Sequence, residues 1–458
     1  MPQPHSHLQA AVQSDFWRVQ RRQLAWLPDV VANELLRRLL QQRRVSPPQL
    51  ELFQHCVTSV ELAGSSITGP WLAYLGAFSS LQVLRLRRCT KLRDGHVQHL
   101  AALAPALQEL DLGGCSGLGD GAAAALLSLT SLRSLDLSGT NLGPDSIRSL
   151  CPALTELTHL NLADVPADDA CCEAAGAHLP SLASLNLAGT AVGDVGMAHL
   201  EPLRSLTALD LSFTQVHCPP LVTSLHELSM NSCSLGIAHD SAQEAVWLQL
   251  GASLPHLQDL QLASTTLLPS HGERLLQALL AGAAGSIRRL DLRDSAFEDG
   301  LEALAGASQL TWLDLSGTAL TDRHLGDLAL LPLRWASFAG TAVGDDGIAQ
   351  CLAMTSLTRL DLSKTRVGDG CWPVLAQLPQ LEWLDLSGSR ITLGTLPEGR
   401  HELAALTYLN LNFSQLENWG CRQLAASCPQ LRELWLGSKA VDDKGLKALC
   451  TLPRVNWG

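Results

Sequence analysis

A ladder of carboxylate and amide side chains holds most of the groups in this sequence that could act as acids or bases. One such residue stands between two apolar residues, usually leucines, in unit after unit of the chain, often in the phrase Leu-Asp-Leu. The carboxylate ladder consists of Asp111, Asp136, Asn161, Asn186, Asp210, Ser229, Gln261, Asp291, Asp314, Ser337, Asp361, Asp385 and Asn410. Paired carboxylates carry acid and base chemistry only when their surroundings separate their pKa values. Nothing in the pattern does so, and we interpret the ladder as structural.

Other reactive side chains are sparse. His96 and His99 stand three residues apart in a predicted helix, and two histidines alone favour a surface position over a metal site. Cys171 and Cys172 begin a predicted helix, which favours buried, unreactive thiols. No phosphate-binding loop, nucleophile elbow or zinc-protease motif occurs in a suitable context. We therefore expect no enzyme activity, no cofactor and no metal.

Aromatic residues gather in the C-terminal repeats. Two positions after the first apolar residue of five consecutive repeats, the chain has Trp312, Trp335, Arg359, Trp383 and Tyr408, and Phe413 and Trp435 follow on what we expect to be the same face. The equivalent positions of the preceding repeats hold no aromatic residue, and aromatics make up only 4% of the chain. Because Trp, Tyr and Arg dominate binding hot spots, we predict that these seven residues bind a partner. The alternative is that the rings pack flat on one another to cover the sheet, with Arg359 stacked between Trp faces.

A repeated unit positions these residues. Its clearest copy runs from Leu357 to Gly370, LTRLDLSKTRVGDG, and about 16 copies begin between Val57 and Leu431. The steps between copies are about 23 to 26 residues, within the period of leucine-rich repeats, except after Leu206. In each LxxLxL phrase the second and third leucines share the inward face of a short strand, and the residue between them points outward. The strands are predicted to stack in parallel.

Two further positions recur in the unit. A small residue follows each predicted strand, and we expect it to bond backbone groups that the turn leaves unpaired. Examples are Cys89, Cys115, Thr140, Thr190, Thr318 and Thr365. An aspartate then opens a helical stretch, where we expect it to cap the helix. Examples are Asp120, Asp194, Asp299, Asp345 and Asp369.

The predicted fold class is α/β, a curved leucine-rich-repeat solenoid with a helical N-terminal cap. Parallel strands lie about 4.8 Å apart whereas packed helices need about 8 to 10 Å, so the array must curve. The parallel sheet then lies on the concave face and the helices lie on the convex face. Concave faces of such arrays are natural binding surfaces.

Charge and composition limit the classes of partner. Residues 1–93 carry 12 Lys and Arg against 5 Asp and Glu, which is +7 and leaves −19 for the remainder of a chain whose net charge is −12. Acidic repeats argue against a nucleic-acid groove. No apolar run approaches about 18 residues, which argues against a membrane span. Thirteen cysteines without paired spacing favour a reducing compartment, the cytoplasm or the nucleus.

The domain prediction has two parts. Residues 1–56 form a basic helical cap, with 1–14 disordered, an amphipathic helix within 27–44 and a second short helix within 49–56. Residues 57–458 form the solenoid, which is irregular at 206–287. That irregular segment is either a hinge or protruding loop, or simple drift of the repeat.

A family resemblance rests on three cysteine-containing phrases, Leu81–Cys89, Leu107–Cys115 and Leu225–Cys233, and on the Asp-Gly helix openings. They resemble the cysteine-containing repeats of ribonuclease-inhibitor-like and F-box leucine-rich-repeat proteins. The N-terminal segment is similar to that of uncharacterised plant and algal leucine-rich-repeat proteins, and LPDVVANELLRRLL resembles the opening of an F-box.

The resemblance implies a monomeric protein-binding adaptor. Its N-terminal helices would dock on a ubiquitin-ligase core, which would make the protein a substrate receptor. The alternative is an inhibitor or ligand sensor that encloses its target in the arc.

Overall fold

The computed structural model describes residues 12–13, 24, 27–64, 66–218, 220–235, 254–267, 277–278, 282–296, 301–394, 402–437, 441–450, 452 and 456–457. The chain divides into two compact units, Met1–Val216 and His217–Gly458. Most of the part predicted to be disordered, 1–14, lies outside the described residues, as does Asp299. The boundary at residue 56 between cap and solenoid stays a prediction.

The first unit opens with the predicted amphipathic helix. Helix α3 spans Asp29–Gln41 and buries Leu35, Leu36 and Leu39. A short 3-10 helix, η2 (Pro47–Phe53), follows Ser46, whose backbone N–H donates to Gln49 Oε1 at 2.8 Å. The sequence prediction of two successive helices is therefore confirmed within the described residues.

The strands of the first unit pair in chain order, and every pairing is parallel. They are β1 (Ser59–Ala63), β2 (Val83–Arg87), β3 (Glu109–Asp111), β4 (Ser134–Asp136), β5 (His159–Asn161), β6 (Ser184–Asn186) and β7 (Ala208–Asp210). Helical segments between them are α4 (Gly69–Leu75), α5 (Asp94–Val97), η3 (Gln98–Leu103), η4 (Asp120–Ala122), α6 (Ala123–Leu126), α7 (Pro144–Leu150), α8 (Asp169–His178) and α9 (Asp194–Ala198).

The second unit repeats this arrangement with parallel pairings from one repeat to the next. Its main strands are β8 (Glu227–Ser229), β10 (Asp259–Gln261), β12 (Arg289–Asp291), β13 (Trp312–Asp314), β14 (Trp335–Ser337), β15 (Arg359–Asp361), β16 (Trp383–Asp385), β17 (Tyr408–Asn410), β18 (Glu433–Trp435) and β19 (Asn456–Trp457). A small separate sheet joins β9 (Ser234–Leu235) to β11 (Thr266–Leu267). Helical segments are η5 (Leu301–Gly306), η6 (Asp322–His324), α12 (Leu325–Leu328), α13 (Asp345–Gln350), η7 (Cys351–Ala353), η8 (Asp369–Cys371), α14 (Trp372–Leu375), α15 (Asn418–Ser427) and α16 (Asp443–Leu449).

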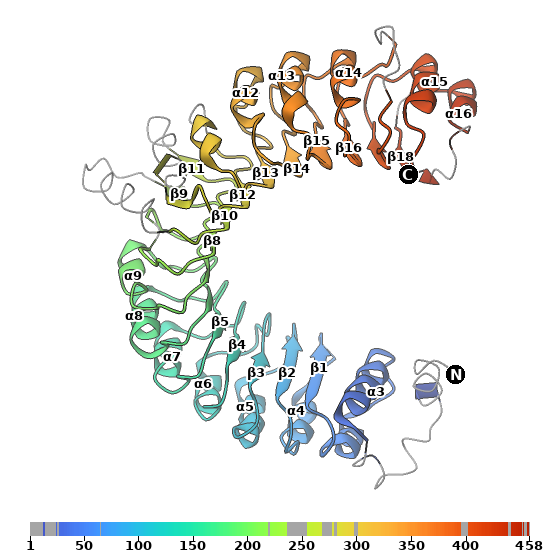
Figure 1. The fold of residues 1–458 in the computed structure, drawn as a ribbon. Helices are drawn as coiled ribbons and strands as arrows, with labels where there is room; N and C mark the ends of the chain where they lie inside the picture. Colours follow the sequence, from blue (N-terminus) through green and yellow to red (C-terminus); the bar gives the residue numbers. More distant parts are fainter. Residues whose placement is uncertain are drawn as a thin grey trace. The chain divides into compact units, whose positions relative to one another are not determined.

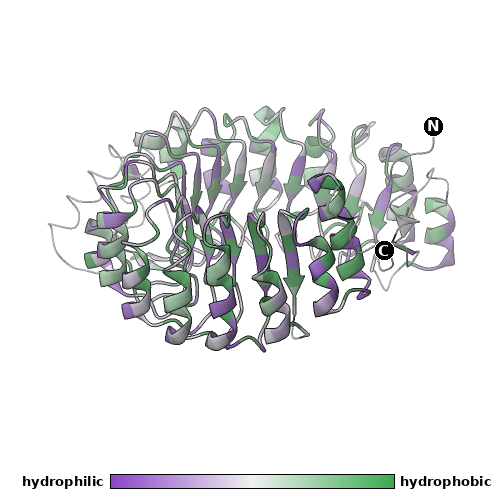
Figure 2. Ribbon diagram, turned by 90° about the horizontal axis from the view of Figure 1, so that it is seen from below, coloured by the Kyte–Doolittle hydropathy of each residue, from purple (hydrophilic) through white to green (hydrophobic). Residues whose placement is uncertain are grey.

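Leucines fill the space between strands and helices. Within each unit the strands form one layer, and the helical segments lie against one face of that layer (Figure 1). Leu357, Leu360 and Leu362 of the repeat phrase are at most 1% exposed. Hydrophobic and hydrophilic residues alternate within the strands and helices (Figure 2), as expected for elements with one buried face.

The small residues after the strands do the predicted work. The Thr365 hydroxyl donates to the carbonyl of Leu362 at 2.6 Å, and the Thr140 hydroxyl donates to the carbonyl of Leu137 at 2.6 Å. The thiol of Cys115 reaches the preceding repeat and donates to the carbonyl of Leu86 at 2.9 Å. These side chains therefore donate to buried carbonyls at the turns, and the carbonyl of Leu137 also accepts from the backbone N–H of Thr140 at 3.1 Å.

The aspartates that open the helices do not cap their own helices, and that prediction was wrong for three of them. Asp120 accepts from the backbone N–H of Gly143 at 2.7 Å, Asp345 from that of Gly368 at 2.8 Å, and Asp369 from that of Leu393 at 2.7 Å. Each carboxylate thus bonds the next repeat. It stands inside the first helical turn, where the positive helix end also favours its charge.

At Gly121 and Gly370, the glycine of an Asp-Gly phrase makes room for the aspartate of the preceding repeat. A Cβ on Gly370 would lie 2.6 Å from Asp345 Oδ2, and one on Gly121 would lie 2.6 Å from Asp94 Oδ2. The Asp-Gly phrase therefore belongs to two interfaces. The aspartate bonds the next repeat, and the glycine packs against the preceding repeat.

We expect Asp345→Ala to lower the free energy of unfolding by about 1 to 2 kcal/mol, because the backbone N–H of Gly368 loses its acceptor. Asp345→Asn should retain most of the stability, since the amide oxygen can accept the same bond. Asp346→Ala, at the exposed neighbouring position, removes the same charge and serves as the control. Thermal denaturation followed by circular dichroism measures all three, and equal losses for Asp345→Ala and Asp346→Ala would contradict this role.

Candidate partner-binding site

Five consecutive strands bring the predicted binding residues into one row. Strand pairing places Trp312 opposite Trp335, Trp335 opposite Arg359, Arg359 opposite Trp383, and Trp383 opposite Tyr408. We call these five residues the aromatic stripe. They point away from the leucine core, because the buried Leu313 and its counterparts alternate with them along each strand.

The rings of the stripe form two stacked pairs. The ring centroids of Trp312 and Trp335 are 4.3 Å apart and the planes differ by 4°, whereas those of Trp383 and Tyr408 are 5.0 Å apart and differ by 11°. Both separations are close to the spacing of parallel strands, about 4.8 Å, so strand register sets the stacking. All four rings are half-buried, which leaves part of each ring open to contact.

A guanidinium stacks on this row at Arg289, which the sequence analysis did not select. Arg289 Cζ lies 3.9 Å from the centroid of the Trp312 ring, and Arg289 Nε lies 3.7 Å from Asp259 Oδ2. The stack therefore runs from Arg289 to Trp335. The signal in the sequence was positional, because Arg289 stands one repeat before Trp312 at the same place in the unit.

Arg359 divides the stripe. Its row position lies between Trp335 and Trp383, yet its side chain is exposed, and among the described residues it has no ion-pair or ring-stacking partner. The part of the alternative that places Arg359 between Trp faces was therefore wrong, although the rings do pack on one another in two pairs.

Two predicted residues lie beside the stripe. Trp435 pairs with Asn410 and so belongs to the row of the carboxylate ladder, where it is 41% exposed. Phe413 lies in the turn after β17 and not in the strand itself, with a φ of 58° and 82% exposure, and its place on the strand face stays a prediction. An aromatic side chain held this far into solvent in a left-handed turn gains little from the core.

The carboxylate ladder ties down the turns that follow the strands. The backbone N–H of Ser363 donates to Asp361 Oδ1 at 2.9 Å, and Ser387 does the same to Asp385 at 2.8 Å. Asn410 keeps this bond with Asn412 at 3.0 Å and also donates from Nδ2 to Asp385 Oδ2 at 2.7 Å. The ladder is therefore structural, as predicted.

Neighbouring carboxylates are compensated where they are most buried. Arg293 lies 2.9 Å from Asp291 and 3.4 Å from Asp314, which relieves the repulsion between these two residues one strand apart. Burial still raises the pKa of Asp314 and of Asp361 above the ordinary value of 3.8. Asp385 adds to the rise at Asp361 through its negative charge.

The remaining reactive residues form no second site. Cys171 and Cys172 are at most 2% exposed, and burial raises the pKa of Cys171 to about 12, so neither thiol ionises readily. His96 accepts from the backbone N–H of Arg93 at 3.1 Å. Within the described part of the chain, no three His, Cys, Asp or Glu side chains gather as a metal site would require.

Comparison with known proteins agrees with the repeat geometry. A family described as "Leucine Rich repeat" matches residues 128–151, which include β4 and its turn. The ribonuclease inhibitor of Sus scrofa is 26% identical over 314 residues, covering 61% of this chain. This chain spans only 63% of the length of that relative.

Solved structures share the same fold. A leucine-rich-repeat protein of Leptospira interrogans superposes with a TM-score of 0.53 at 19% identity, over 79% of this chain and 91% of that one. The mouse RP105/MD-1 complex gives 0.52 at 17% identity, over 90% of this chain and 69% of that one. The chain has the leucine-rich-repeat fold. The shared repeat explains the strand row on which the stripe is built but not its aromatic residues.

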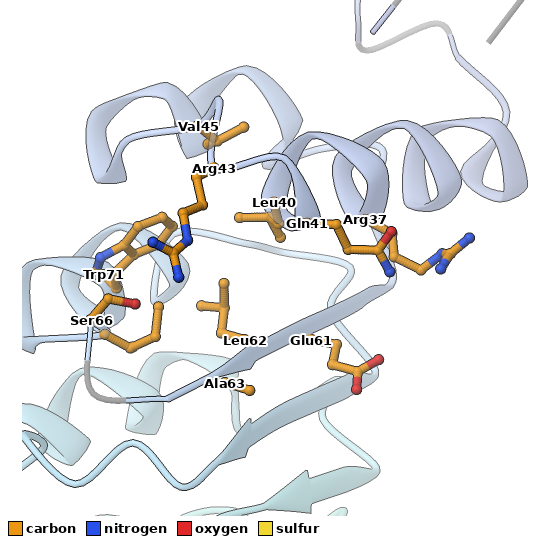
Figure 3. Close-up of a pocket in the computed structure, with 11 residues that line it drawn as sticks. Arg37, Leu40, Gln41, Arg43, Val45, Glu61, Leu62, Ala63, Ser66 and Trp71 are labelled. Carbon is orange, nitrogen blue, oxygen red and sulfur yellow. The ribbon is translucent and has the colours of Figure 1, made fainter. Parts of the chain in front are cut away.

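The first unit carries a separate hollow beside α3. We call it the head groove, a cavity of about 400 Å³ whose lining includes Arg37, Leu40, Arg43, Leu62 and Trp71. Leu40 from α3 and Leu62 from β1 point toward each other across it, and the arginines and Trp71 lie at its edges (Figure 3). Among the described helices, none is long and apolar enough to cross a membrane.

We expect Asp361→Asn to raise the melting temperature at pH 7. The folded protein holds the Asp361 proton more tightly than the unfolded chain, so ionised Asp361 opposes folding at neutral pH. Asparagine keeps the bond to Ser363, as Asn410 keeps its own.

The gain should shrink as the pH falls through the raised pKa and disappear below 3.8, where aspartate is protonated in both states. Asp361→Leu is the control for the hydrogen bond and should destabilise the fold at every pH. Thermal melts between pH 3.5 and 7 measure this, and a loss of stability for Asp361→Asn at pH 7 would contradict the assignment.

Proposed function

We propose that this protein is a scaffold that binds a protein partner through the aromatic stripe of its second unit. The observation that supports this most is the row itself, in which four of five consecutive, register-paired positions are half-buried aromatic rings. Trp and Tyr carry much of the binding energy at protein interfaces.

The stacked rings favour tight contact for an energetic reason. Ordering a free side chain on binding costs about 0.5 to 1.5 kcal/mol, and rings already held in stacks at 4.3 and 5.0 Å avoid much of that cost. The apolar area that remains open is then buried at about 25 cal/mol per Å². Trp435, 41% exposed one row away, extends this surface.

The head groove supports a second contact, which would make the protein an adaptor. Its apolar floor and its arginines suit a partner helix or loop with acidic edges, and a ubiquitin-ligase core is the partner that the N-terminal helices favour. Beside it, Asn33 accepts from the backbone N–H of Thr58 at 3.0 Å and of Ser59 at 3.2 Å. Asn33 thereby covers polar groups at the start of the array, as a cap for residues 57–458 should.

A second candidate is an inhibitor that encloses its target. The likeness to the ribonuclease inhibitor of Sus scrofa favours it, as does a long row of exposed positions on parallel strands. In that case one partner would contact the stripe, and no partner would bind in the head groove. For either candidate the thirteen free cysteines support a reducing compartment such as the cytoplasm, and the proposal takes the chain as a monomer with a binding rather than a catalytic role.

Trp335→Ala together with Trp383→Ala should remove specific partners, with affinity falling at least about a hundredfold because each hot-spot ring contributes about 2 kcal/mol or more. Affinity purification from cells followed by mass spectrometry compares the variant with the wild type. Trp419→Ala is the control, since Trp419 on α15 is 54% exposed but lies outside the stripe. Identical partner lists for the double variant and the wild type would refute the proposed site.

Leu40→Asp should separate the two candidates, because it places a charge on the floor of the head groove. An adaptor should lose one set of partners and keep those that depend on the stripe, whereas an inhibitor should keep its target. Val30→Asp is the matched control on the same helix, where Val30 is 73% exposed. The same purification reads out both variants, and melting curves confirm that each is folded.

A further inference from the structure

The aromatic stripe is symmetric about Arg359. One stacked pair is centred between β13 and β14, and the other is centred between β16 and β17, while Arg359 lies on β15. Each pair is therefore one and a half strand steps from Arg359, about 7 Å at a strand spacing of about 4.8 Å. A partner lying along the stripe meets apolar surface, a cation, and apolar surface at nearly equal intervals of about 7 Å.

Among the residues of the row, Arg359 is a cation that is available to a partner. Arg289 at the end of the row is engaged with Asp259 and Trp312, and Arg293 lies between Asp291 and Asp314. Arg359 is exposed, and no described carboxylate lies within ion-pair distance of it. An incoming carboxylate would gain a charge-assisted, bidentate contact there.

The spacing favours an extended peptide as the occupant. In a strand, residues i, i+2 and i+4 point to the same side and are about 6.6 to 6.8 Å apart in succession, which matches about 7 Å. On one face of a helix, residues i, i+4 and i+8 span about 12 Å in total, whereas the two ring pairs are about 14 Å apart. An extended segment therefore matches the three positions more closely than a helical face does.

The carboxylate ladder does not reverse the charge preference at Arg359. Asp361 stands two residues further along β15, about 6.6 Å away, whereas a carboxylate bound to Arg359 would be about 2.8 Å from the guanidinium. Because Coulomb energy falls with distance, the attraction to Arg359 at the shorter range exceeds the repulsion by Asp361 at the longer one. Asp361 is also partly neutralised by the N–H of Ser363 at 2.9 Å.

We propose, resting on the proposed function of the stripe, that the stripe binds an extended acidic peptide segment of its partner. Two apolar side chains contact the ring pairs Trp312–Trp335 and Trp383–Tyr408, and an Asp or Glu midway between them pairs with Arg359. The recognised pattern is apolar, any residue, acidic, any residue, apolar.

The test is selection from a displayed library of random nine-residue peptides against the full-length wild-type protein and the Arg359→Glu variant. The wild type should enrich the pattern with Asp or Glu at its centre. The Arg359→Glu variant should enrich Lys or Arg there, with the apolar residues unchanged. Arg422→Glu, an equal charge change on α15, should select as the wild type does.

The best wild-type peptide should then bind at least about tenfold more weakly to Arg359→Ala, and its central acid changed to the amide should cost a similar factor, which corresponds to about 1.4 kcal/mol. Fluorescence anisotropy measures both losses. Failure to enrich the pattern, a basic central residue, or binding that ignores Arg359 would overturn the peptide assignment.

This failure is distinguishable from failure of the proposed function. If Trp335→Ala with Trp383→Ala removes cellular partners while the library shows no acidic centre, the stripe binds a partner of other chemistry. If the double Trp variant keeps every partner, the stripe is not the binding surface.

Discussion

The spacing of about 4.8 Å between hydrogen-bonded parallel strands is the constraint on which the rest of the molecule depends. A repeat of about 24 residues has to bring the chain back by that small step while it also fits a helical segment that needs nearly twice the room. The leucines fill the space between strands and helices, and the register places Leu360 beside Ala336 and Leu384 of the neighbouring strands. The same step places identical outward positions face to face, so that rings at one position become stacks at 4.3 and 5.0 Å.

The fold and the proposed binding surface therefore depend on different residue positions of the same repeat. On the core side of the turn, Leu362 is buried and its carbonyl accepts from the Thr365 hydroxyl. On the outward side, the Asp361 carboxylate accepts from the backbone N–H of Ser363. Trp335 and Arg359, two positions after the first apolar residue, bear on none of these contacts and are free to vary with the partner. Because the backbone fixes their spacing, a change of one outward residue alters the surface without altering the arc of strands that carries it.

The sequence predicted whatever lies within one repeat. Apolar alternation fixed which leucines are buried, and the turn hydroxyl of Thr365 was predicted with its purpose. What depends on a neighbouring repeat was harder to predict. The carboxylate of Asp345 was assigned to its own helix because the sequence does not show that the next repeat brings the N–H of Gly368 closer. The sequence did not single out Arg289 as the cation over Trp312, because side-chain torsions decide which arginine stacks on a ring. The head groove was not predicted either, because it depends on how α3 packs against β1.

The Asp-Gly phrase that opens many helices has a consequence for how such a chain can grow. Asp345 accepts a hydrogen bond from the repeat after it, and Gly370 leaves room for the carboxylate of the repeat before it. Such a unit therefore carries an aspartate for the contact with the next repeat and a glycine for the contact with the preceding one. A gene segment that encodes one unit and is copied in tandem therefore yields two ends that already fit. Lengthening the array needs no new complementary pair, whereas a unit that lost its glycine would be incompatible with every predecessor that kept its aspartate.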